Sequence, residues 1–226
     1  MEVLCFIKAV KKKYSNSFLT KGHIFMNSTD FFRKYELSDQ NVGDSFEGAS
    51  YVLEENAALS YSFDNENFTK ITDQGFDFRL FDEKQETNIY CLYCITDQDW
   101  EIRNGSYYHT IPLKFIKEFA DHDFFLIPSP GYFLERIQKN WPDILYEPVK
   151  YYPKSKEWES KTLFEKREKY SYQKEFRIAV LGKFNGPISL YLGDLSDIAE
   201  KIDLTESKRV FVIVEAYQSE KKEFQK

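Results

Sequence analysis

The stretch that decides the fold is Tyr170-Ser171-Tyr172-Gln173-Lys174-Glu175-Phe176-Arg177-Ile178-Ala179-Val180-Leu181. Its first half is polar and aromatic, and its second half is an apolar run typical of a buried β-strand. On a strand, Glu175 and Arg177 lie two residues apart and therefore point to the same face. An acid beside a guanidinium at the start of a buried strand forms either a structural ion pair or part of a pocket, and the pattern leaves both open.

Other apolar runs of strand length surround this stretch. The clearest is Asn88 to Thr96, a continuous run that predicts a central strand. Further strands are expected at 3–7, 23–27, 107–111, 124–127, 149–152, 188–192 and 209–214, and helices at 14–20, 31–35, 113–120, 132–140 and 195–202. Residues 157–169 are expected to form an exposed, charged helix or loop. Strands outnumber helices, which predicts an α+β fold of mostly antiparallel or mixed sheets with a few flanking helices.

The composition is that of a folded, water-soluble chain. Of its 226 residues, 42% are apolar and 30% are charged, and we expect one domain over residues 1–218 followed by a charged tail at 219–226. The formal net charge of −6 argues against nucleic-acid binding through a global basic field. No apolar run is long enough for a bilayer span, and the N-terminus has no signal-peptide pattern, so we expect no membrane partner and a cytoplasmic location.

The three cysteines are too few for a disulfide framework, and two of them form a Cys-x-x-Cys spacing at Cys91 and Cys94. The spacing falls inside the apolar run, where residues three apart face opposite sides of a strand. A zinc knuckle needs a turn there and a second pair of ligands, and the three histidines have no ligand spacing. Buried structural cysteines are the interpretation that we adopt, and no metal site is predicted.

A turn bracketed by glycines, Gly43-Asp44-Ser45-Phe46-Glu47-Gly48, carries two acids three residues apart. Asp44 and Glu47 are suited to binding a metal ion or orienting a base toward a substrate. The alternative is ordinary loop chemistry, in which Asp44 forms an Asx turn and Glu47 is exposed.

Several short motifs, taken in order, resemble a family of small bacterial and phage-associated proteins of unknown function. They are Gly22-His23-Ile24-Phe25, Phe31-Phe32, Asp44-Ser45-Phe46-Glu47-Gly48 and Tyr170 to Arg177. The matches are spread over residues 3–215, so the resemblance covers nearly the whole chain. The chain departs from the family at Gln173, where an acid is expected.

The same layout resembles the ADP-ribosyltransferase fold, in which a late Gln/Glu-x-Glu motif enters a strand. By this resemblance Glu175 would be catalytic and contact the nicotinamide ribose of NAD, while Gln173 would orient the acceptor and Arg177 would belong to the same ligand site. The resemblance also implies ring or polar ligand contacts from Tyr14, Phe25, Phe31 and Asn27.

We therefore predict a protein of a bacterial or phage conflict system, with a cleft between the Asp44–Glu47 turn and the Gln173–Arg177 strand. It would bind a nucleotide-like ligand such as NAD and transfer ADP-ribose. A second hypothesis is a non-catalytic binding or immunity module whose acidic surface recognises a basic protein partner. A third is a metal-dependent nuclease with Asp44, Glu47 and Glu175 around a divalent ion, which the negative net charge counts against.

Overall fold

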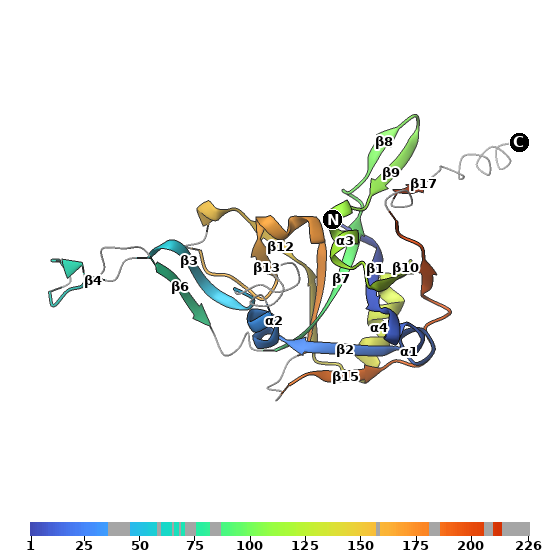
Figure 1. Cartoon of the computed structure of the whole chain (residues 1–226), viewed down its shortest axis with the longest axis horizontal. Helices are drawn as coiled ribbons and strands as arrows, with labels where there is room; N and C mark the ends of the chain where they lie inside the picture. Colours follow the sequence, from blue (N-terminus) through green and yellow to red (C-terminus); the bar gives the residue numbers. More distant parts are fainter. Residues whose placement is uncertain are drawn as a thin grey trace, which may run out of the picture.

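A computed structural model describes residues 1–35, 46–57, 60–64, 66–67, 69–70, 76–81, 87–156, 159–180, 186–205 and 210–213 (Figure 1). The N-terminal half contains β1 (Val3–Lys11), η1 (Lys12–Tyr14), α1 (Ser15–Lys21), β2 (His23–Ser28), α2 (Thr29–Tyr35), β3 (Ala49–Ala57), β4 (Ser60–Tyr61), β5 (Thr69–Lys70), β6 (Phe76–Phe81), β7 (Asn88–Thr96), β8 (Glu101–Arg103) and β9 (Ser106–Thr110). The C-terminal half contains α3 (Leu113–Glu118), β10 (His122–Ile127), α4 (Pro130–Asn140), β11 (Ile144–Pro148), β12 (Lys150–Tyr152), η3 (Lys154–Lys156), β13 (Glu165–Arg167), η4 (Glu168–Gln173), β14 (Glu175–Val180), β15 (Ile188–Tyr191), β16 (Glu200–Ile202) and β17 (Val210–Ile213).

An eight-stranded sheet of antiparallel pairs organises the chain, in the order β11-β14-β7-β1-β10-β16, and β2 pairs with β7 while β15 pairs with β2. This sheet, with its helices, confirms the predicted α+β class. The central strand β7 has the predicted bounds and is buried along almost its whole length. Strands covered on both faces read as continuous apolar runs, which is why this element was recognisable from sequence.

The cavity described below lies at one edge of β7, where the strand pairing is interrupted. One edge of β7 pairs with β14 from Asn88 to Tyr93. The other edge pairs with β1 only from Tyr93 onward and with β2 only at Asn88 and Ile89. Between these two ladders, the positions Tyr90 to Leu92 face neither strand, so β1 and β2 diverge along β7 and leave a gap between them.

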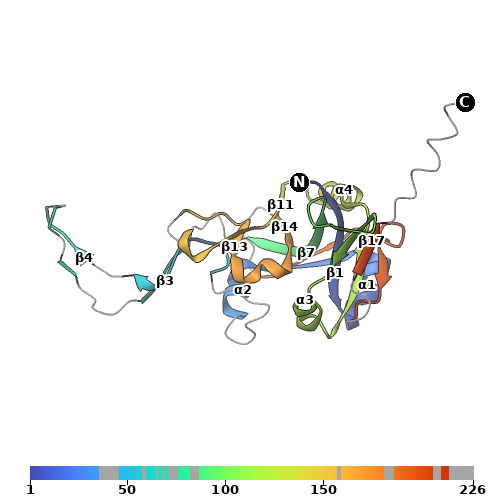
Figure 2. The same cartoon turned by 90° about the horizontal axis from the view of Figure 1, so that it is seen from above.

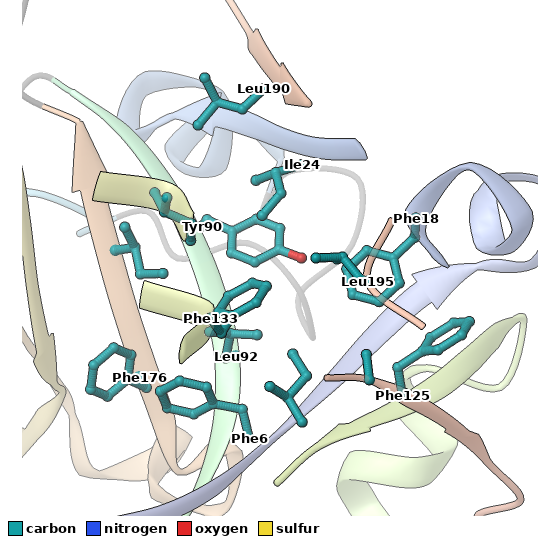
Figure 3. Close-up of a cluster of buried hydrophobic side chains, with 14 of the residues drawn as sticks. Phe6, Phe18, Ile24, Tyr90, Leu92, Phe125, Phe133, Phe176, Leu190 and Leu195 are labelled. Carbon is teal, nitrogen blue, oxygen red and sulfur yellow. The ribbon is translucent and has the colours of Figure 1, made fainter. Parts of the chain in front are cut away.

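Aromatic and branched side chains fill both sides of the sheet. Neighbouring residues of β1 illustrate the alternation, because Phe6 belongs to one buried cluster and Ile7 to the other. In the larger cluster, the Phe6 ring lies 4.6 Å from the Phe176 ring and 6.3 Å from Phe133 of α4 (Figure 3). The smaller cluster packs against α3 through Phe115. The central strands are thus held from both faces by ring packing.

Three sequence-based expectations need correction. The strand expected at 3–7 continues to Lys11, so Lys8 lies within β1. Residues 157–169 were expected to be an exposed helix or loop, but β13 pairs in parallel with β12 and buries Lys166 and Arg167. The helix expected at 195–202 is a turn followed by β16, with the Asp194 carboxylate accepting the Ser196 N–H at 2.8 Å.

The antiparallel ribbon of β3 and β6 extends away from the large sheet, as Figure 2 shows from above. Within the part of the chain that the structure describes, no helix combines the length and the apolar character needed to cross a bilayer.

Candidate functional site

A cavity of about 860 Å³ opens where β1 and β2 diverge along β7. Its walls combine aromatic rings with charged side chains, drawn mainly from the strands β1, β2, β7, β13, β14 and β15 and the helices α1, α2 and α3. The rings and apolar chains include Tyr14, Phe18, Phe25, Phe31, Phe32, Ile89, Tyr90, Leu92, Phe115, Phe119 and Tyr191, and the charged groups are Lys8, Lys11, Lys13, Glu47, Lys166 and Glu175. Predominantly apolar walls with a few convergent polar groups are typical of a small-molecule site.

The wall formed by β14 is held by a buried ion cluster. Glu175 and Arg177 point to the same face of β14, as predicted, and Arg177 Nε donates to Glu175 Oε1 at 2.7 Å. The other end of the guanidinium holds Glu47 through both carboxylate oxygens, at 2.6 and 3.1 Å, and also donates to the Leu163 carbonyl. Arg177 is completely buried. The two alternatives from the sequence therefore coincide, since Glu175 is ion-paired and also lines the cavity.

Lys166 extends the ion cluster from β13. Its ammonium lies 3.2 Å from Glu175 Oε2 and donates to Gln173 Oε1 at 3.0 Å. The Gln173 amide in turn donates to Glu118 of α3 at 3.1 Å. Two carboxylates and two cations are thus buried together, which satisfies the rule that charges inside a protein must be paired.

These contacts set the protonation state of the ion cluster. Burial alone would raise the pKa of Glu175, but the charges of Arg177 and Lys166 outweigh it and hold that pKa below its ordinary value. Burial likewise opposes the charge on Arg177, and the carboxylates of Glu175 and Glu47 overcome it and raise the arginine pKa further. The carboxylate of Glu175 is therefore ionised at neutral pH, with each oxygen bonded to a cation.

Lys8 reaches the gap at the open edge of β7. Its ammonium donates to the Cys91 carbonyl at 2.7 Å and lies 3.9 Å from the centre of the Tyr90 ring. A strand carbonyl outside the β-ladder needs a donor, and Lys8 supplies it. Desolvation lowers the pKa of Lys8 from its ordinary 10.5 to about 8, with Cys91 and Glu175 acting in the opposite direction. The ammonium keeps its charge at neutral pH and loses it in mildly alkaline solution.

Tyr90, one of the residues that line the cavity, carries an unsatisfied polar atom. The residue is 4% exposed, and its hydroxyl has no hydrogen-bond partner among the described residues. Figure 3 shows this hydroxyl directed toward the side where Phe18 and Leu195 lie. A buried hydroxyl without a partner costs about 1–3 kcal/mol.

The structure places seven of the nine predicted site residues around this cavity: Glu175, Gln173, Glu47, Asn27, Tyr14, Phe25 and Phe31. Arg177 lies behind the wall and contacts the cavity only through the carboxylates that it holds. Asp44 lies outside the described residues. Gln173 does not share the strand face of Glu175, because the chain turns through Lys174, with φ of 39°, before β14 begins. The catalytic and binding roles assigned to these residues stay predictions.

Sequence reasoning missed several residues of the site, among them Lys8, Lys11, Lys13, Lys166, Tyr90 and Tyr191. Tyr191 carried a usable signal, since it follows the buried Leu190 on a short strand and must point outward. The same alternation along a strand applies to Lys8, which follows the buried Ile7 on β1 once that strand is extended to Lys11. Tyr90 had none, because one more aromatic residue in an apolar run is indistinguishable from core.

Two of the three carboxylates that the nuclease hypothesis uses are held in ion pairs, and the third, Asp44, lies outside the described residues. Glu47 and Glu175 bind Arg177 and Lys166. No group of three or more His, Cys, Asp or Glu side chains in the described ranges is arranged to hold a metal ion. Cys91 and Cys94 point to opposite sides of β7 as predicted, with Cys91 at the cavity and Cys94 in the larger core cluster.

Comparison of the chain with family models, with curated proteins and with solved structures finds no match.

Proposed function

We propose that this chain binds a small ligand of the nucleotide class, an anion that carries a planar ring, in the cavity between β1, β2 and β7. The observation that carries the proposal is the combination of aromatic walls with a surplus of positive charge in one cavity. Ring faces suit a base or a nicotinamide, and ammonium groups suit phosphates.

The charge balance supports an anionic ligand. The two glutamates on the wall, Glu47 and Glu175, are matched by Lys166 and Arg177 within the ion cluster. The three other lysines of the wall, Lys8, Lys11 and Lys13, therefore give the cavity its net positive charge. This local field is opposite in sign to the formal net charge of −6 on the whole chain. A cavity of about 860 Å³ is within the range of drug-sized and cofactor sites.

The test is calorimetric titration with adenosine monophosphate, adenosine and inorganic phosphate, each at up to millimolar concentration. We expect the monophosphate to bind more tightly than adenosine or inorganic phosphate alone. At a hundredfold excess over its Kd, it should also raise the free energy of unfolding by about 2.7 kcal/mol. Lys11→Met and Phe31→Ala should weaken binding. Matched changes on α4, Lys139→Met and Tyr132→Ala, should not. Absence of binding by any nucleotide, or unchanged affinity in both cavity variants, would overturn the proposal.

Transfer of ADP-ribose from NAD is the second candidate, favoured by the position of the ionised Glu175 beside Gln173 on the same wall. Because both Glu175 oxygens bond cations, we assign the carboxylate an electrostatic and positioning role toward the ribose. The measurement is nicotinamide release from NAD by the wild type and by Gln173→Ala, which leaves the ion pairs intact. Binding of NAD without any release would reject transfer and leave ligand binding standing.

A cytoplasmic location also belongs to this proposal. All three cysteines are free thiols, and Cys91 lines the cavity. Free thiols fit a reducing compartment.

A further inference from the structure

The outer face of the ribbon formed by β2 and β15 carries an aromatic rim at the mouth of the cavity. The antiparallel register pairs His23 with Tyr191 and Phe25 with Ser189. Alternation along both strands buries Ile24, Met26 and Leu190 in the core and turns the paired residues outward. We define the rim as Tyr14, His23, Phe25 and Tyr191, all of which line the cavity.

The rings of the rim are already ordered against one another. His23 and Tyr191 stack with centroids 4.8 Å apart and planes 11° apart, and His23 Nε2 shares a hydrogen bond of 3.1 Å with the Ser189 hydroxyl. Tyr14 and Phe25 meet the His23 ring edge-on, at 6.4 and 6.5 Å.

The rim nevertheless remains open to solvent, since Tyr191 is 59% exposed and Phe25 is 50% exposed. A ring stacked on one face and open on the other offers a flat apolar surface at little ordering cost.

Cations lie beside the rim. The Lys13 ammonium is 4.7 Å from the centre of the Tyr14 ring, and Lys11 and Lys13 line the cavity together with the rim residues. Aromatic platforms beside basic side chains are the combination by which proteins hold unpaired nucleobases and their phosphates. A protein partner with an acidic surface would use the lysines, but it would not need the ordered ring stack.

We infer that the rim is a second stacking site and that the ligand carries two planar bases joined by phosphates. One ring occupies the inner cavity, the second stacks on Tyr191, and Lys11 and Lys13 hold the phosphates between them. This inference rests on the proposed function and specifies its ligand. The chemistry is shared by a dinucleotide such as NAD and by a short single-stranded oligonucleotide.

The experiment compares the affinities of adenosine monophosphate, NAD, the two-base oligonucleotide ApA and an eight-base oligoadenylate. We expect NAD and ApA to bind roughly tenfold or more tightly than the monophosphate, because stacking of one further base contributes about that factor. Tyr191→Ala should lower the affinity for NAD and ApA more than the affinity for the monophosphate, and so remove most of this advantage. Tyr132→Ala on α4, an equally exposed tyrosine, should leave both affinities unchanged.

The eight-base oligoadenylate distinguishes a dinucleotide ligand from a single-stranded nucleic acid. Tighter binding of the eight-base strand than of ApA, with a steep dependence on salt, would assign the rim to single-stranded nucleic acid. Equal binding would assign it to a dinucleotide.

Equal affinity for one-base and two-base ligands, or an advantage that survives Tyr191→Ala, would overturn the inference, and both results are expected if the rim binds a protein instead. Failure of the monophosphate and of every two-base ligand to bind would overturn the proposed function itself. The two failures are therefore distinguishable.

Discussion

Replacing Glu175 by Gln tests whether the buried ion cluster holds the fold together. The substitution keeps the shape of the side chain and removes one of the two carboxylates that balance Arg177 and Lys166. Removing one partner of a buried ion pair typically costs 3–5 kcal/mol, since the remaining charge stays buried without compensation. The Gln carbonyl can still accept one hydrogen bond, so we expect a loss at the lower end, about 3 kcal/mol of unfolding free energy at pH 7.

A second substitution separates charge balance from local packing. Adding Lys166→Met to Glu175→Gln leaves Arg177 paired with Glu47 and restores equal numbers of charges. The double variant should lose about 1–3 kcal/mol less than the sum of the two single losses. The control is Glu101→Gln, because the ion pair of Glu101 with Arg103 is exposed on both sides and should contribute well under 1 kcal/mol.

The contribution of Glu175 to the free energy of unfolding should decrease in acid. The pKa of Glu175 is depressed in the folded chain, so its stabilisation is complete above the unfolded value near 4.5 and is lost as pH falls below it. Urea unfolding followed by tryptophan fluorescence at pH 7 and pH 4 should show the gap between wild type and Glu175→Gln narrowing in acid. A loss at pH 7 no larger than that of Glu101→Gln would refute a structural role for the pair.

Two further predictions concern the backbone and Lys8. Gly22→Ala should lower the free energy of unfolding, measured in urea, by at least about 2 kcal/mol, because Gly22 has φ of +59° and a Cβ there would lie 2.5 Å from the Gly193 carbonyl oxygen. The control is Gly105→Ala, which should cost only about 1 kcal/mol, because Gly105 has φ of +78° but open space around it. For Lys8, the lowered pKa means that the folded chain binds this proton more weakly than the unfolded chain, so the wild type should gain roughly 2 kcal/mol relative to Lys8→Met between pH 8 and 10.5. If the free energies of unfolding of the wild type and of Lys8→Met changed equally with pH, the buried position of the ammonium would be contradicted.

The elements that sequence predicted best are those whose environment is the same on both faces. β7 is buried along almost its whole length and the apolar half of β14 throughout, so their composition alone identified them. The shared face of Glu175 and Arg177 followed from the period of two along a strand, and the hydrogen bond at 2.7 Å agrees with it. The helix expected at 14–20 ends where expected, because Gly22 adopts the left-handed conformation that favours glycine after a helix.

The segment before β14 could not be predicted because its partners are remote in the sequence. A run rich in Lys and Glu normally indicates a solvated surface, yet Lys166 is buried. It is buried because Glu47, more than a hundred positions earlier, and Glu175 both approach it. The turn at Lys174 was hidden for a different reason, since lysine has no preference for positive φ and nothing in the local pattern indicates a left-handed residue.

The alternatives of structural pair and binding pocket, left open at the sequence level, depend on each other in the folded chain. A cavity at an open strand edge needs a wall that does not collapse into it, and the ion cluster around Arg177 fixes that wall. By neutralising Glu47 and Glu175, the same cluster leaves Lys8, Lys11 and Lys13 to set the net charge of the cavity. It follows that a loss of activity in Glu175→Gln would not by itself identify a catalytic group, because the substitution alters the wall and the field together. Surface substitutions on the aromatic rim, which leave the ion cluster intact, separate ligand recognition from folding.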